Sequence, residues 1–373
     1  MSASPPGHAA AGDDVVAARF GRVRARMAEV GVEALLLSTG ADLPWLTGYE
    51  AMPLERLTML VVPVVGEAVL VVPRLEAPRV VPHEAFVVHP WDETDDPVAV
   101  VAGLLGRATA VAVGDRTWAR FVVELLDARP GLALRRAVDV TGPLRMVKDA
   151  AEIAALQRGA DAVDAIALAL RDRPFAGRTE LEISRELVDS MLAAGHERAN
   201  FAIVATGPNG ASPHHDPTDR AVAPGDVVLC DFGGTIGGYC SDITRMFVVG
   251  EPAPEVRDAY AVLVAAQEAG VQAGVVGAPC EAVDAATRAV IDEAGYGEYF
   301  VHRTGHGIGT EEHEDPYMVA GNELPIEPGY AWSVEPGIYL PGRFGLRLED
   351  IVVATAGGPR RLTHAPRDLA VVS

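Results

Sequence analysis

The amino-acid sequence predicts a two-domain protein, in which an α/β domain is followed by an α+β domain built from two similar halves. The length of 373 residues exceeds the size at which one hydrophobic core usually stops growing, which favours two domains. Helix and strand patterns alternate over about the first 140 residues, whereas further along the chain pairs of helices are followed by hairpins. The change of pattern marks the expected boundary.

The amino-acid composition excludes several classes of protein. Hydrophobic residues make up 49% and charged residues 22% of the chain, as in ordinary globular proteins. The net charge of -21 leaves no basic face for phosphates, so no nucleic-acid partner is expected. No apolar run is long enough for a membrane span, and residues 1–13 look like a flexible tail rather than a signal peptide. Three cysteines, Cys230, Cys240 and Cys280, are expected to be buried free thiols in a cytoplasmic protein.

The first domain is assigned to residues 14–143. It begins with an amphipathic helix over 15–30, followed by the apolar strand 34–38. The same two patterns predict further strands at 57–65, 68–72, 85–89 and 110–113, with helices at 98–105 and 118–128. The pattern breaks at Thr141-Gly-Pro, so the second domain is assigned to residues 144–373.

The second domain repeats one plan. Helices at about 149–172 and 179–194 precede a hairpin, and helices at about 254–275 and 278–294 precede another. Thr179 and Glu182 have the spacing of a capping box, which supports the start of the second helix. We therefore expect two helix-hairpin halves related by a pseudo-twofold axis.

Each hairpin carries a pair of acids. If the Gly-rich turn after Phe232 is centred between Ile236 and Gly237, Asp231 and Asp242 lie directly opposite each other on one face. Like charges placed there destabilise a sheet unless a cation binds between them.

The same counting of residues from the turn applies to the second hairpin. Glu335 and Glu349 each lie seven residues from Gly342, and His306 is expected on a strand between the two hairpins.

A single acid beside a glycine turn is usually a turn residue, but five candidate ligands in apolar surroundings are better explained by metal. Four buried carboxylates would repel one another at a cost of several kcal/mol unless cations neutralised them, so the set predicts a two-metal site. Oxygen ligands with one imidazole favour Mn, and also Co, Fe or Zn. Two such ions can hold a bridging hydroxide and polarise a carbonyl, which favours hydrolysis.

These phrases resemble those of the pita-bread metallopeptidases, which include prolidase (Xaa-Pro dipeptidase), aminopeptidase P and methionine aminopeptidase. The likeness covers the whole second domain, and the N-terminal creatinase-like α/β domain is similar to that of prolidase and aminopeptidase P. By this resemblance Asp231 and Asp242 would hold one metal and His306 and Glu335 the other. Asp242 and Glu349 would bridge, and Glu335 would also accept a proton.

The resemblance also implies catalytic roles for His214, His302, His313 and Arg347 in addition to Glu335. Imidazoles can donate hydrogen bonds to an oxyanion or carry a proton near neutral pH. Arg347 would orient an acidic ligand or form a structural ion pair. His215 follows His214 directly, so either histidine could face the substrate.

The expected activity is hydrolysis of the bond before proline, on a small peptide with proline at the second position, by a homodimeric enzyme. Whether the chain acts as a dipeptidase or an aminopeptidase stays open. One alternative is a creatinase-like hydrolase or lyase of the same fold acting on a non-peptide substrate. The other is a non-catalytic binding protein of this fold. The complete ligand set argues against both alternatives.

Overall fold

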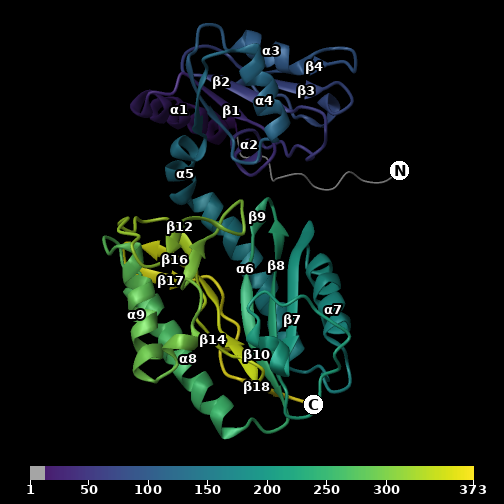
Figure 1. Cartoon of the computed structure of the whole chain (residues 1–373), viewed down its shortest axis with the longest axis vertical. Helices are drawn as coiled ribbons and strands as arrows, with labels where there is room; N and C mark the ends of the chain where they lie inside the picture. Colours follow the sequence, from purple (N-terminus) through teal and green to yellow (C-terminus); the bar gives the residue numbers. More distant parts are fainter. Residues whose placement is uncertain (1–12) are drawn as a thin grey trace. The chain divides into compact units, whose positions relative to one another are not determined.

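The computed structural model describes residues 13–373, which fall into two compact units that divide between Arg145 and Met146 (Figure 1). Apart from Asp13, which begins the first helix, the predicted tail over residues 1–13 lies outside the described residues. No helix within the described part of the chain is long and apolar enough to cross a membrane.

The predicted break at Thr141-Gly-Pro is wrong, because helix α5 (Val138–Met146) runs through Pro143. A proline inside a helix leaves the carbonyl four residues earlier without its usual donor. Here that carbonyl belongs to Asp139, and it accepts a hydrogen bond from Arg26 Nε at 3.4 Å. A side chain thus replaces the missing backbone donor.

The first unit is a six-stranded mixed sheet in the order β4-β3-β2-β1-β5-β6. Helices and strands alternate along it as predicted, and the short elements α2 and β6 are additions. The elements before α5 are α1 (Asp13–Val30), β1 (Ala34–Leu37), α2 (Asp42–Thr47), β2 (Met59–Pro63), β3 (Ala68–Pro73), the 3-10 turn Ala77–Arg79, β4 (Phe86–Trp91), α3 (Pro97–Leu104), β5 (Ala110–Val113), α4 (Ala119–Ala128) and β6 (Ala133–Arg136).

Side-chain alternation along β1 divides the core of this unit into two layers. Leu35 and Leu37 pack with residues of α1 such as Phe20, whereas Leu36 on the opposite face packs with residues of α3 and α4 such as Phe121. The sheet is therefore covered by helices on both faces, as its apolar strands predict.

The first half of the second unit (residues 146–249) starts with two helices that both begin with capping boxes, Asp149 with Glu152 and Thr179 with Glu182. Strand β18 from the end of the chain joins β10 at the edge of its sheet, which has the order β18-β10-β8-β7. The elements are α6 (Ala150–Leu170), α7 (Glu180–Ala193), β7 (Arg198–Thr206), the 3-10 turn Gly207–Ala211, β8 (Val227–Ile236), β9 (Tyr239–Cys240), β10 (Ile243–Val249) and β18 (Ala370–Val372).

The second half (residues 254–349) repeats the helix pair, and its sheet continues to residue 361 in the order β12-β11-β13-β16-β17. In Figure 1, α7 and α9 flank the strands of the unit from opposite sides. The elements are α8 (Pro254–Ala273), α9 (Cys280–Glu293), the 3-10 turn Gly297–Tyr299, β11 (Gly305–Gly307), β12 (Glu314–Met318), β13 (Ala331–Val334), β14 (Gly337–Leu340), β15 (Phe344–Arg347), β16 (Asp350–Thr355) and β17 (Gly358–Arg361).

The predicted pairing of Asp231 with Asp242 is wrong. Strands β8 and β10 place Asp231 opposite Thr244. Gly237 and Gly238 together form the turn, with φ values of 58° and 78°, so its centre lies one residue later than expected and the register moves by two. Asp242 consequently lies diagonally across from Asp231 instead of facing it.

The second hairpin has the predicted register. Val334 pairs with Asp350 and Gly337 pairs with Arg347, which brackets Glu335 and Glu349 as opposite positions. Its turn contains Gly342 at a φ of 72°, where the sequence placed the centre. The two hairpins therefore present their acids with different offsets.

Candidate metal centre

All five candidate ligands line one cavity of about 640 Å³ in the second unit. The cavity wall also includes His214, His302, His313 and Arg347, so every residue to which the sequence assigned a catalytic or ligand role reaches the same space. Its other lining residues are Phe201, Ile203, Pro213, Arg303, Glu312 and Val319.

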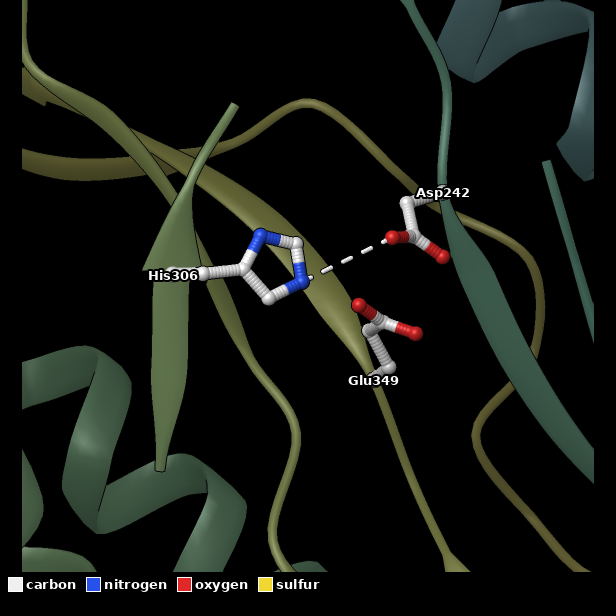
Figure 2. Close-up of side chains that lie close together, drawn as sticks. All are labelled: Asp242, His306 and Glu349. Carbon is white, nitrogen blue, oxygen red and sulfur yellow. Dashed lines mark ion pairs between the residues drawn. The ribbon is translucent and has the colours of Figure 1, made fainter. Parts of the chain in front are cut away.

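The closest group consists of Asp242, His306 and Glu349, whose ligand atoms lie within 4.8 Å of one another (Figure 2). His306 comes from the short strand β11, and its Nε2 lies 3.7 Å from Asp242 Oδ2. All three side chains are buried. They converge from three separate segments of the chain, as Figure 2 shows, and Asp242 and Glu349 directly precede β10 and β16.

The other two acids lie at the margins of this group. Glu335 Oε1 is 3.2 Å from His306 Nε2 and accepts a hydrogen bond from Ser333 Oγ at 3.1 Å. Asp231 Oδ2 forms a short ion pair with Arg347, which crosses from β15 of the second hairpin. Arg347 thus connects the acid of one hairpin to the strand of the other.

Three buried carboxylate oxygens of this cluster have no hydrogen-bond partner within residues 13–373, namely Asp231 Oδ1, Asp242 Oδ1 and Glu349 Oε1. A buried polar atom without a partner costs about 1–3 kcal/mol, and more when it carries a charge. Carboxylate oxygens suit divalent cations such as Mn, and imidazole nitrogen suits Fe and Zn. The residues present therefore fit divalent metal ions.

The protonation of the cluster supports the same conclusion. Burial raises the pKa of Asp242 and of Glu349 well above the ordinary values, and the charges of neighbouring carboxylates raise both further. Burial would also raise the pKa of Glu335, but its hydrogen bond with His306 and nearby positive charges lower it to about 2. Without cations the cluster cannot be fully ionised near neutral pH.

Two of the cavity histidines have distinct surroundings. Burial lowers the pKa of His302, whose Nδ1 lies 2.7 Å from the Arg303 carbonyl and whose Nε2 lies 2.9 Å from the Tyr339 hydroxyl. Since the carbonyl can only accept, Nδ1 donates and Nε2 accepts from Tyr339. The ring of His313 lies 3.9 Å from that of His306, on the exposed side of the cavity.

The neighbouring histidines 214 and 215 have different positions. His214 lines the cavity, whereas His215 Nε2 lies 2.8 Å from the buried Glu180 carboxylate. Glu180 also accepts hydrogen bonds from Thr206, Asn209 and Thr218. The His214 side chain therefore faces the candidate centre, and His215 anchors the loop that carries it.

The loop carrying His302 has a matching anchor in the second half. Asp284 Oδ1 of α9 accepts hydrogen bonds from Thr304 N and Oγ1 at 3.0 and 2.8 Å. Arg288, paired with Asp284, donates to the carbonyls of Phe300 and His302.

Several functional contacts were missed by the sequence prediction. The buried Tyr339 hydroxyl accepts a hydrogen bond from Arg347 Nη1 at 2.9 Å, and burial raises its pKa to about 12. Tyr339 lies four residues after Glu335 in the same phrase, but its neighbours come from elsewhere in the chain. The predicted free thiols are confirmed, and all three cysteines are buried.

Comparison with known proteins identifies both parts of the chain. Residues 19–147 match the model of the creatinase/prolidase N-terminal domain, and residues 151–356 match metallopeptidase family M24. A probable dipeptidase PepE of Mycobacterium tuberculosis is 43% identical over 365 residues, which covers 96% of this chain and 97% of that protein.

Solved structures give the same result. The prolidase from Thermococcus sibiricus has a TM-score of 0.89 at 36% identity, covering 94% of this chain and 97% of its own. An X-Pro aminopeptidase from Thermotoga maritima has a TM-score of 0.84 at 30% identity, covering 95% and 99%. The chain therefore belongs to metallopeptidase family M24, as a peptidase with a creatinase/prolidase N-terminal domain and a C-terminal domain of the pita-bread fold.

Proposed function

We propose that this peptidase hydrolyses the bond before proline in short peptides and that two divalent ions, with Mn as the first choice and Co, Zn or Fe as substitutes, serve the reaction. The observation that carries the proposal is the set of three buried carboxylate oxygens without hydrogen-bond partners among the described residues, in the cavity that His306 also lines. They lie in a cavity of about 640 Å³, a volume suited to a small peptide.

The ligand roles follow the resemblance to prolidase and aminopeptidase P. Asp231 and Asp242 would hold one ion, His306 and Glu335 the other, and Asp242 with Glu349 would bind both. When bound, the ions supply Lewis acidity for the carbonyl oxygen and make a water molecule more acidic. Arg347 holds Asp231 in place through its ion pair.

The remaining residues serve proton transfer and hydrogen bonding. Glu335, the carboxyl group with the lowered pKa, is ionised and can accept a proton from water. His302 is held in one tautomer by the Arg303 carbonyl, so its Nε2 accepts a hydrogen bond from the Tyr339 hydroxyl. His214 and His313 face the cavity and can donate to the developing oxyanion or to the leaving nitrogen.

The proline preference is supported by apolar walls and by the relatives. Phe201, Ile203 and Val319 offer a hydrocarbon surface to a pyrrolidine ring. Proteins named Xaa-Pro dipeptidase include one from Lactobacillus delbrueckii that is 30% identical over 366 residues. We also propose a cytoplasmic homodimer, as the family resemblance of the sequence implies.

Hydrolysis by the Mn-loaded protein tests the proposal. We expect Leu-Pro to be cleaved at least ~10-fold faster than Leu-Leu, and we expect EDTA to abolish and Mn to restore the activity. Equal cleavage of the two peptides would contradict the proline preference. Turnover of creatine in place of peptides, or no hydrolysis after loading with Mn or Co, would favour the creatinase-like or the non-catalytic alternative.

A further inference from the structure

One acid of the cavity wall does not belong to the ligand cluster. Within the described part of the chain five acids line the cavity, and four of them are the candidate ligands. The fifth is Glu312, whose side chain is half-buried and makes no ion pair or hydrogen bond within residues 13–373. A carboxylate that lines a cavity without a counterion attracts cationic groups that enter it.

We propose that Glu312 binds the cationic side chain of a lysine or arginine before proline, so that the peptidase prefers Lys-Pro and Arg-Pro to neutral Xaa-Pro peptides. The inference rests on the proposed function and adds the preferred residue before proline to it. The proline side chain carries no charge, so in an Xaa-Pro dipeptide the preceding residue is the one whose side chain can be cationic. An ammonium or guanidinium group forms a charge-assisted hydrogen bond with a carboxylate.

The loop that carries Glu312 is held in place by groups other than the Glu312 carboxylate. Glu314 forms a buried ion pair with Lys148, whose Nζ lies 2.6 Å from Glu314 Oε1. Three residues before Glu312, the backbone N–H of Gly309 donates to the Glu311 carbonyl at 3.1 Å. The loop is thus fixed on both sides of Glu312, and a substrate cation would meet a carboxylate whose backbone is already ordered.

The charge of Glu312 is not compensated by Arg303, the arginine of the cavity wall nearest to it in the sequence. The Arg303 guanidinium packs over the Tyr317 ring at 4.2 Å, and its Nη2 lies 3.3 Å from His313 Nδ1. Glu312 instead acts on Cys240 of β9: burial raises the pKa of this thiol, and the charge of Glu312 raises it further. The carboxylate therefore lies toward β9.

A long cationic side chain also needs an apolar surface for its methylene groups, and one lies on the same side of the cavity. Phe201 of β7 lines the cavity, and its neighbour Asn200 donates to Cys240 Sγ at 3.7 Å. The backbone N–H of Cys240 donates to the Gly309 carbonyl at 2.8 Å. Strand β7, strand β9 and the loop of Glu312 thus adjoin, so an aromatic wall and an acid come from neighbouring segments.

Kinetics on matched dipeptides test the assignment with the Mn-loaded protein. We expect kcat/KM for Lys-Pro to exceed that for Met-Pro, whose side chain is of similar length and uncharged, by on the order of 10-fold. Glu312→Gln keeps the shape without the charge, so it should lower the value for Lys-Pro and change that for Met-Pro by less than about twofold. Glu312→Lys should reverse the preference and favour Glu-Pro over Lys-Pro.

Glu311→Gln is the matched control, because it removes one negative charge from the same loop at a position that does not line the cavity. It should keep the wild-type preference for Lys-Pro. A loss of preference equal to that of Glu312→Gln would overturn the proposal and assign the effect to the general charge of the loop.

Two further outcomes would overturn the proposal. Equal losses of Glu312→Gln on Lys-Pro and Met-Pro would show that the residue binds the α-ammonium group shared by both peptides, or that it positions His313. No loss on either peptide would show that Glu312 is an acid that faces solvent.

Failure of this inference can be distinguished from failure of the proposed function. If wild type cleaves Leu-Pro without distinguishing Lys-Pro from Met-Pro, the proposed function stands and the inference fails. If wild type cleaves no prolyl peptide, the proposed function fails, and calorimetric titration with the intact Lys-Pro and Met-Pro still decides the role of Glu312. Tighter binding of Lys-Pro by at least ~10-fold, lost in Glu312→Gln, would support that role, and equal binding of the two peptides by wild type would overturn it.

Discussion

The two halves of the catalytic unit present carboxylates to one cavity through different strand registers. In the first half the two-residue turn Gly237-Gly238 sets Asp231 diagonally to Asp242. In the second half the register places Glu335 directly opposite Glu349. A shared plan of helix pair and hairpin therefore does not produce equivalent acid pairs.

The difference shows how the halves depend on each other. Since Asp231 does not face an acid of its own hairpin, its Oδ2 is paired with Arg347 of the other hairpin. Asp242 instead lies with His306 and Glu349 of the second half. Asp231 and Asp242 of the first half thus have their closest charged neighbours in the second half, whereas Glu335 is paired with His306 of its own half.

The largest effect is expected from removing Asp242, the acid of the first half that belongs to both proposed metal sites. Asp242→Asn should lower peptidase activity by on the order of 10³-fold or more, because a ligand and a charge are both lost. The metal-free variant should be as stable as wild type or more so, since one like charge has left a buried cluster. Thermal unfolding with and without Mn and initial rates measure the two effects.

Asp258→Asn, at an exposed position of α8, is the control for Asp242→Asn. Full activity of the Asp242 variant, or a rise in its Tm with Mn equal to that of wild type, would show that the site is assigned wrongly.

The histidine loops give a second contrast, between the anchors Glu180 and Asp284. Glu180→Gln replaces one acceptor oxygen by an NH2 group that faces other donors. We therefore expect the free energy of unfolding to fall by about 1–3 kcal/mol at pH 7. Asp284→Asn keeps an acceptor for Thr304 and loses mainly a partly exposed ion pair, so the free energy of unfolding should fall by about 1 kcal/mol.

The Glu180 effect should also depend on pH. Burial opposes ionisation of Glu180, but hydrogen bonds from Thr218, His215, Asn209 and Thr206 outweigh it and lower its pKa below the ordinary 4.5. A depressed carboxyl pKa stabilises the fold above the unfolded value, and this contribution is lost as the pH falls through the folded value. The difference in unfolding free energy between wild type and Glu180→Gln should therefore shrink below about pH 4.5. A difference that grows on acidification would contradict this assignment.

The smallest effect concerns the two turns. Gly237 and Gly342 both have positive φ, and a Cβ at either position meets no close contact. Alanine should therefore cost about 1–2 kcal/mol at each site through backbone conformation alone. Urea unfolding measures the loss of stability in both variants. Activity should suffer more from Gly237→Ala, because two consecutive residues with positive φ set the offset of Asp242. Equal activities would show that the offset does not depend on this turn.

Hydrophobic periodicity, helix-capping residues and turn residues in the sequence were sufficient to predict most of the fold. The helices with capping boxes were placed to within about two residues, since Asp149 and Thr179 satisfy the first backbone donors locally. Strand β6 was missed because its residues are mostly exposed and show no alternation. Helix α5 was missed because a distant side chain, Arg26, stabilises it.

The candidate site was predictable as a set of residues and less so as a geometry. A run of several glycines allows several turn centres, so the offset between Asp231 and Asp242 could not be fixed from the sequence. The second turn, Pro341-Gly342, has one glycine, so only one strand register was compatible with it. Tyr339 contacts His302 from another part of the chain, and Arg303 contacts Tyr317 across a loop, and neither contact follows from helix or strand periodicity.

The buried cysteines bear on how the protein tolerates oxidants and heavy metals. Cys230 and Cys240 lie one and two residues from candidate ligands, but both pack into hydrophobic clusters and neither lines the cavity. Burial raises the thiol pKa of both, and it raises that of Cys280 to about 11. Since the thiolate is the form that reacts with peroxide and captures cadmium or mercury, these thiols stay inert near neutral pH. The protein should withstand purification without added reductant.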